Sequence, residues 1–346
     1  MLIRKTQDLL RDILIFSDSV SLRPWENITS VFGETSTWHC QAPRSEYRIL
    51  QKDNFSQLSR LSSYLKDILI PRIPLKKSKS IYVKCDSPAK TADKEAWFFV
   101  NGVATNEKVA KWNGKRLRDL FNRPITVLFN PTNGLGMDLA ECIFDRTLEW
   151  TTEPAKYVRK NLAKALKDRE KEKVVVIAHS QGGIIVAAAL EKLAKKYKQY
   201  FHKLEIYTFA CPADEMATMT ECFGNFCRRI NKPYLEHFIN KQDLVAKLGA
   251  LRTANCWQPP TWSSKLLNLG IPRLLVNSES EDFFNVKIDG DIYINDRKGH
   301  LLNAHYLFDF EKMPYKLNCS HSSKQAKLYR YLDGGCGEVY IGLIEN

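Results

Sequence analysis

Four short runs of apolar residues in the middle of the chain predict buried strands, because they are rich in β-branched and aromatic side chains. Longer stretches with apolar residues at helical spacing lie between these runs, as at 155–168 and 183–200. Because parallel strands need long crossover connections, this alternation predicts an α/β fold with a mostly parallel sheet and helices on both faces. The four runs are 97–102, 125–130, 174–179 and 204–210, and two further strands are expected at 234–240 and 291–295, followed by a helix from about 301 to 310.

The first ninety residues follow a different pattern. Apolar residues recur at helical spacing over 55–70, prolines then interrupt the pattern, and a strand-like run follows at 80–84. We therefore predict an irregular N-terminal extension of mixed helix and strand over 1–90 and an α/β domain over 91–346. Within the domain, 251–285 fits no regular period and is predicted to be an insertion.

Composition limits the class of protein and the partners to expect. The chain has 346 residues, 44% of them hydrophobic, which is enough for one large core or two smaller ones. Lys and Arg number 52 against 39 Asp and Glu, and this net charge of +13 would attract the protein to phosphates, with peripheral contact with an anionic membrane as the expected form. A solvated face is the simpler explanation, because the lysines are scattered over predicted helix surfaces. We expect no nucleic acid as partner, because no recognition motif for it accompanies the charge.

Cysteine usage and the opening segment favour a cytoplasmic location. The nine cysteines are an odd number with no secretory signal ahead of them, which indicates reduced thiols. Charged residues interrupt the apolar positions of 1–15, so this segment predicts neither a signal peptide nor a membrane span. Peripheral membrane association and signal-independent export are both compatible with this expectation.

The most informative stretch is 174–185, where a buried strand runs into a turn of small residues and then a helix. A nucleophilic serine needs a tight, strained turn, and only small residues two before and two after it let strand and helix approach closely. Ser180 has Ala178 and Gly182 at these positions. The helix that opens at Gln181 would aim backbone N–H groups and a positive dipole end at a developing oxyanion.

The run from Ala178 to Gly183, Ala-His-Ser-Gln-Gly-Gly, resembles the nucleophile region of lipase-like serine esterases in the α/β-hydrolase superfamily. The usual pattern has Gly in place of Ala178. The resemblance covers about 97–310 and implies a fold of the α/β-hydrolase type. It also implies hydrolysis of a carboxylic ester through an acyl-enzyme on Ser180, with no cofactor, and triad partners in the chain order serine, acid, histidine.

Candidates for both partners follow predicted strands. Asp243 comes just past the strand expected at 234–240 and is our predicted acid, although a turn Asp that caps the next helix would look the same. Asp214 is a weaker competitor. For the base, His300 lies in the loop after the last strand and is favoured over His305, which would already lie in the following helix.

The resemblance implies two backbone N–H donors for an oxyanion hole. One is that of Gln181, directly after the serine. The other would come from the loop after the strand at 97–102, where Gly102 permits a turn and Val103 is the expected donor. Lipases commonly have His-Gly at this point, whereas this chain has Asn101-Gly102, a dipeptide that a plain turn also explains.

The predicted insertion bears on the substrate. Its apolar residues, among them Trp257, Trp262 and Leu266, suit a lid or a wall of an acyl pocket, although packing against the N-terminal extension would use the same residues. Together with the net charge, they favour a phospholipid or acylglycerol over a small soluble ester.

The sequence supports other classes of protein less well. The glycines of 133–136 follow a predicted strand, as in a nucleotide-binding protein, but the third glycine of a dinucleotide site and the Lys-Ser/Thr of a P-loop are both missing. Cys222 and Cys227 lack a second ligand pair at metal-binding spacing, so we predict no metal site. A catalytically inactive interaction protein that keeps the hydrolase fold is the principal alternative function.

Overall fold

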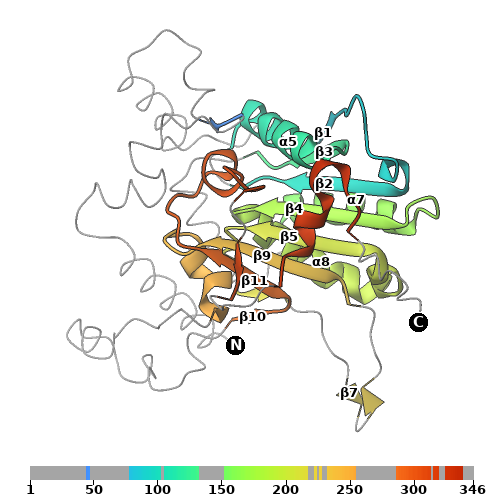
Figure 1. Cartoon of the computed structure of the whole chain (residues 1–346). Helices are drawn as coiled ribbons and strands as arrows, with labels where there is room; N and C mark the ends of the chain where they lie inside the picture. Colours follow the sequence, from blue (N-terminus) through green and yellow to red (C-terminus); the bar gives the residue numbers. More distant parts are fainter. Residues whose placement is uncertain are drawn as a thin grey trace, which may run out of the picture.

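The computed structural model of the chain is described here for residues 44–46, 78–102, 105–131, 152–216, 222–223, 226–227, 232–254, 286–312, 315–318 and 324–337. Its main element is an eight-stranded sheet in the order β1-β3-β2-β4-β5-β9-β11-β12 (Figure 1). The six inner strands are mutually parallel, and the edge strands β1 and β12 run antiparallel to their neighbours. The strands are β1 (Lys79–Val83), β2 (Glu95–Val100), β3 (Ile125–Phe129), β4 (Lys173–His179), β5 (Leu204–Phe209), β9 (Tyr234–Asn240), β11 (Asp291–Asn295) and β12 (Lys316–Leu317).

Helices cover both faces of the sheet, as the alternating pattern predicts (Figure 1). Alternate residues of β2 show the division: Phe98 and Val100 pack into the cluster that contains residues of α7 and α8, and Trp97 and Phe99 into the one that contains residues of α5. Each of the three helices is amphipathic, with its apolar side on the sheet. They are α5 (Glu107–Phe121), α7 (Glu153–Lys167) and α8 (Gln181–Tyr197).

Short elements complete the described fold. The sheet begins within the predicted N-terminal extension, because β1 pairs along its whole length with β3. No helix in the described ranges is long and apolar enough to cross a membrane. The short elements are β6 (Glu215–Met216), β7 (Cys222–Phe223), β8 (Phe226–Cys227), β10 (Lys287–Ile288), and the turns η2 (Ala92–Lys94), η3 (Lys198–Lys203), η4 (Ala246–Leu248), η5 (Ala250–Thr253), η8 (Leu302–Tyr306) and η9 (Lys327–Gly334).

The prediction of a helix from about 301 to 310 is wrong. The chain forms a single π-helical turn there, η8, and Asp309 adopts a positive φ of 48°. Distant residues bind the backbone on both sides of this turn, because Glu46 accepts from N–H groups of η8 and Arg116 donates to Leu307 O. Of the insertion predicted at 251–285, only 251–254 are described, and Leu251 is buried in the core. The proposed lid residues lie outside the described residues.

Candidate active site

Ser180 occupies a strained turn between β4 and α8. Its φ of 56° and ψ of −129° lie in a region that non-glycine residues rarely adopt. Hydrogen bonds fix this backbone on both sides, from Ser180 N to Phe209 O at 2.9 Å and from Gly183 N to Ser180 O at 2.8 Å. The turn therefore fixes the Ser180 side chain at the carboxyl edge of the sheet.

Two glycines let other backbone segments approach this turn. A Cβ at Gly182 would lie 2.4 Å from Val100 O, so only glycine lets α8 start this close to the end of β2. A Cβ at Gly102 would lie 2.4 Å from Ser180 Cβ and 3.1 Å from Ser180 Oγ. The loop after β2 therefore passes directly beside the serine, where the predicted oxyanion hole requires it.

Ser180, His300 and Asp243 form one continuous chain of hydrogen bonds. His300 Nε2 lies 2.8 Å from Ser180 Oγ, and His300 Nδ1 lies 2.8 Å from Asp243 Oδ2. All three are buried, with 1%, 5% and 0% of their surface exposed for Ser180, His300 and Asp243. A neutral imidazole with its proton on Nδ1 donates to Asp243 and leaves Nε2 free to accept from the serine hydroxyl. This arrangement suits proton transfer from the serine to His300.

The Asp243 carboxylate has further partners that fix its orientation. Oδ1 accepts from Val245 N at 2.9 Å, and Oδ2 accepts from the Tyr306 hydroxyl at 2.7 Å. The Tyr306 hydroxyl accepts in turn from Asn240 N at 3.1 Å. Burial, reinforced by the charge of Asp243, holds the pKa of Tyr306 well above its usual value, so this phenol stays a hydrogen-bond donor. Tyr306 therefore orients the carboxylate that binds His300.

Two more side chains hold the loop that carries His300. His179 Nε2 lies 2.7 Å from His300 O, and Asn240 Nδ2 donates to Gly299 O at 2.9 Å. Burial, together with the nearby charge of His300, lowers the pKa of His179 to about 3. His179 is therefore neutral at pH 7, and its Nε2–H donates to the His300 carbonyl.

The competing candidates have other contacts. His305 Nδ1 accepts from Leu301 N at 2.9 Å, which holds the start of η8, so the histidine that reaches Ser180 is His300. Asp214 accepts from Lys287 N through its backbone carbonyl, where β6 and β10 pair, and the carboxylate that reaches His300 is that of Asp243.

Of the two predicted oxyanion donors, the structure describes the one at Gln181. Gln181 opens α8 directly after Ser180, where backbone N–H groups have no partner within the helix. Its side chain accepts from Asn130 Nδ2 at 3.3 Å, and Asn101 binds the Asn130 backbone at both N and O, each at 2.8 Å. These bonds tie the ends of β2 and β3 to the start of α8. Val103, the other predicted donor, lies outside the described residues.

The sequence analysis did not single out several residues that bind the candidate site or the loop that carries His300. These are Tyr306, Asn240, Glu46 and His179. Only His179 carried a signal in the sequence, because it directly precedes the serine in the turn.

The described residues contain no group of three or more His, Cys, Asp or Glu side chains that could hold a metal ion. Of Cys222 and Cys227 only the backbone pairing is described, and 133–136 lie outside the described residues.

Three comparisons relate the chain to known proteins. Residues 90–252 match the model of a family described as "Alpha/beta hydrolase of unknown function (DUF900)". The fold is similar to that of an esterase from Pyrobaculum calidifontis, at 12% identity and a TM-score of 0.31, over 57% of this chain and 79% of that one. A second structure, of a hyperthermophilic esterase from the same archaeon, gives 11% identity and a TM-score of 0.30 over 66% and 82%. No curated protein matches the sequence.

Proposed function

We propose that the protein is a serine hydrolase that cleaves carboxylic esters through an acyl-enzyme on Ser180. Its fold is of the α/β-hydrolase type, with a mostly parallel sheet of eight strands and a match to an alpha/beta hydrolase family over residues 90–252. The observation that supports this proposal best is the chain of hydrogen bonds from Ser180 through His300 to Asp243, which begins at a strained turn. These are the parts that acyl transfer by a serine requires.

In the first half of the proposed reaction, Ser180 becomes acylated. His300 Nε2 accepts the hydroxyl proton as Ser180 Oγ forms a bond to the ester carbonyl carbon. Asp243 stabilises the imidazolium that results, and the N–H groups of Gln181 and Val103 bind the oxyanion. The intermediate then collapses, the bond to the alcohol oxygen breaks, and His300 returns its proton to the departing alcohol.

In the second half, water releases the acid. His300 Nε2 takes a proton from a water molecule, and the water oxygen attacks the acyl carbon. When this second tetrahedral intermediate collapses, the bond to Ser180 Oγ breaks and the proton on His300 returns to the serine. One ester and one water thus give one alcohol and one carboxylic acid, and the enzyme regains its starting state.

We further propose that the ester is that of a lipid, an acylglycerol or a phospholipid. Two features of the sequence support this choice, the net charge of +13 and the tryptophans and leucines of the segment 251–285. If this segment acts as a lid, activity on long-chain esters rises sharply at a lipid interface, and deletion of 256–268 removes that rise. Equal activity of the two proteins at the interface would contradict the lid.

Labelling with a fluorophosphonate tests the proposed nucleophile. Such a probe reacts when an activated serine oxygen displaces fluoride from phosphorus, so the wild type should be labelled and Ser180→Ala should not. Ser80→Ala serves as the matched control, because Ser80 is an exposed serine of β1 whose hydroxyl bonds to that of Tyr157. Labelling of Ser80→Ala should equal that of the wild type.

The same experiment distinguishes the proposed hydrolase from the principal alternative function. A catalytically inactive hydrolase-fold protein that acts by binding would give a folded wild type that takes up no probe and hydrolyses no ester. Labelling that persists in Ser180→Ala would contradict the proposal in a different way, because it would place the reactive serine elsewhere.

A further inference from the structure

Residues 44–46 lie against the turn that follows His300, although 257 positions separate Glu46 from Asn303. The Glu46 carboxylate is buried and accepts two backbone hydrogen bonds. Oε1 accepts from Asn303 N at 2.8 Å, and Oε2 accepts from Ala304 N at 2.9 Å. The first N–H groups of any helical turn lack partners within it, so Glu46 supplies from outside what η8 cannot supply itself.

Arg44 strengthens this attachment. Its carbonyl accepts from Asn303 Nδ2 at 2.8 Å, and its guanidinium Nε donates to Asp119 Oδ2 on α5 at 2.5 Å. The short segment 44–46 therefore bridges α5 and η8. It docks on the sheet domain through a buried carboxylate, a backbone carbonyl and an ion pair.

The turn held in this way carries two parts of the candidate site. His300 precedes η8 by two residues, and Tyr306, which binds Asp243 Oδ2, ends it. No side chain of η8's own N-cap caps the turn. The Glu46 contact therefore holds the backbone between the His300 ring and Tyr306, beside the bonds that His179 and Asn240 make to residues 300 and 299.

The charges of Glu46 and His300 also influence each other. Burial raises the pKa of Glu46 to about 7, while the two N–H donors and the charge of His300 act to lower it. The negative charge of an ionised Glu46 attracts the positive charge that His300 carries during the proposed acyl transfer. Arg44, two residues before Glu46, is paired with Asp119, and the other titratable side chain of η8 is that of His305.

We propose that Glu46 is a positioning residue for His300, holding η8 through its two backbone hydrogen bonds and favouring the imidazolium that forms during acyl transfer. This inference rests on the proposed function, because it assigns a role within that reaction. A purely structural Glu46 would affect stability and leave the reactivity of Ser180 unchanged in the folded protein.

The test compares Glu46→Gln with the wild type and with Glu311→Gln in the full chain. Glu311 is the matched control, because its carboxylate pairs with Arg116 a few residues after η8 and bonds to none of the site residues. The rate at which a fluorophosphonate labels Ser180 is measured from pH 5.5 to 8.5. Circular dichroism and urea unfolding confirm at each pH that every variant is folded.

We expect Glu46→Gln to be labelled about tenfold more slowly than the wild type at pH 8, because it loses the charge and one of two charge-assisted hydrogen bonds. The difference should shrink toward pH 5.5, where the wild-type Glu46 is itself protonated. A folded Glu46→Gln labelled at the wild-type rate throughout, or slowed no more than Glu311→Gln, would overturn the positioning role alone. A wild type that is never labelled would overturn the proposed function and this inference with it.

Discussion

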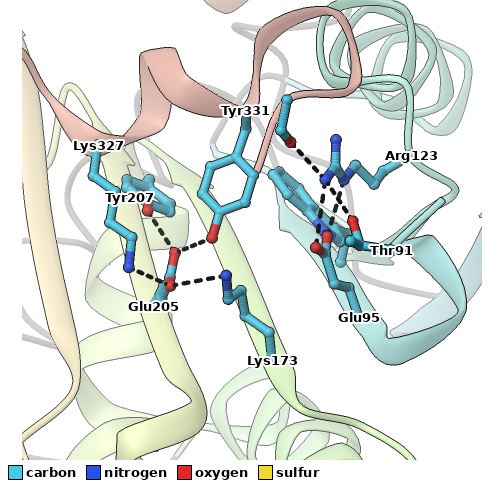
Figure 2. Close-up of polar contacts among 10 residues, drawn as sticks. Thr91, Glu95, Arg123, Lys173, Glu205, Tyr207, Lys327 and Tyr331 are labelled. Atoms are coloured by element: carbon cyan, nitrogen blue, oxygen red, sulfur yellow. Dashed lines mark hydrogen bonds and ion pairs between the residues drawn. The ribbon is translucent and has the colours of Figure 1, made fainter. Parts of the chain in front are cut away.

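The parallel strands of the sheet begin at its amino edge and end at its carboxyl edge, and these two edges use buried polar groups in opposite ways. At the carboxyl edge, Ser180, His300 and Asp243 meet at a backbone turn with a strained φ. At the amino edge, two buried carboxylates, Glu95 at the start of β2 and Glu205 near the start of β5, bind cations and phenols on ordinary strand backbone (Figure 2).

The amino edge pairs its buried charges with several partners each. Arg123, fully buried, donates to Glu95 Oε2 at 2.9 Å and to Gly335 O at 2.8 Å. Glu205 Oε1 accepts from Lys327 Nζ at 2.6 Å, and its Oε2 accepts from the Tyr331 hydroxyl at 2.7 Å (Figure 2). Because Gly335, Lys327 and Tyr331 belong to the C-terminal part of the chain, these bonds attach η9 to the sheet.

The buried polar groups of the two edges therefore suit different roles. The amino edge satisfies its charges with fixed partners, so its polar groups contribute to the attachment of η9 and have no free reactive atom. The carboxyl edge places the Ser180 hydroxyl against the His300 imidazole, which is the arrangement that the proposed acyl transfer requires. Substitutions at the two edges should therefore separate activity from stability.

Ser180→Ala should have the largest effect and should act on activity alone. We expect kcat for a short p-nitrophenyl ester to fall by about 10⁶-fold, the loss seen when a triad serine is removed. The free energy of unfolding in urea should change by less than about 1 kcal/mol, because only one hydrogen bond is removed. A large loss of stability with residual activity would break the division between the two edges.

Arg123→Met should have the opposite profile. The substitution leaves Glu95 buried without its cation, so we expect a loss of about 3–5 kcal/mol in the free energy of unfolding. Adding Glu95→Gln should restore part of the lost unfolding free energy, because the double variant no longer buries an unpaired carboxylate. Esterase activity per folded molecule should stay at the wild-type level, and a fall in kcat beyond the unfolded fraction would show that the amino edge supports the site.

Tyr306→Phe should have a smaller effect at the carboxyl edge. It removes a hydroxyl that donates to Asp243, so we expect kcat to fall about tenfold, with a loss of about 1–3 kcal/mol in stability. Tyr293→Phe is the matched control, because the Tyr293 hydroxyl is buried and has no hydrogen-bond partner among the described residues. The control should retain wild-type kcat and stability. Equal effects of the two substitutions would contradict a specific role for Tyr306.

The pH dependence of stability should show the smallest effect. Burial lowers the pKa of His179 to about 3 and that of His237 to about 4, both below the value of about 6.5 expected in the unfolded chain. The unfolded state therefore binds more protons, and these two groups destabilise the fold as the pH falls from about 6.5 toward 3.

The histidine His237 tests this in isolation, because it lies in β9 away from the triad and binds Thr208 and Asp289 O. His237→Gln should flatten the plot of unfolding free energy against pH by about 1 kcal/mol per pH unit between pH 6 and 4. An unchanged slope would show that His237 titrates normally in the folded protein.

The sheet could be predicted from the sequence because each strand is marked by residues within the strand itself. Each inner strand is a short apolar run, and strand alternation with helices predicts parallel pairing. Asp243 and His300 were found because each follows such a strand, and the structure brings both within hydrogen-bond distance of their expected partners. Their catalytic roles, and that of Ser180, stay predictions.

What the sequence did not reveal depends on contacts between distant segments. The expected helix at 301–310 is a π-helical turn whose N–H groups bind Glu46, and no local pattern links these two regions. In the sequence, Tyr306 looks like one more apolar position of the expected helix, although its hydroxyl donates a hydrogen bond to Asp243. Such residues become visible only when strand order sets which loops share an edge.

If Ser180 carries an acyl group during turnover, that group can be trapped. The protein is mixed with p-nitrophenyl butyrate, quenched in acid within milliseconds, and analysed by intact mass and peptide mapping. We expect a burst of p-nitrophenol and one butyryl group on the peptide that contains Ser180. Hydrolysis of the ester with no acyl group on that peptide, or an acyl group on another residue, would contradict the proposed acyl-enzyme.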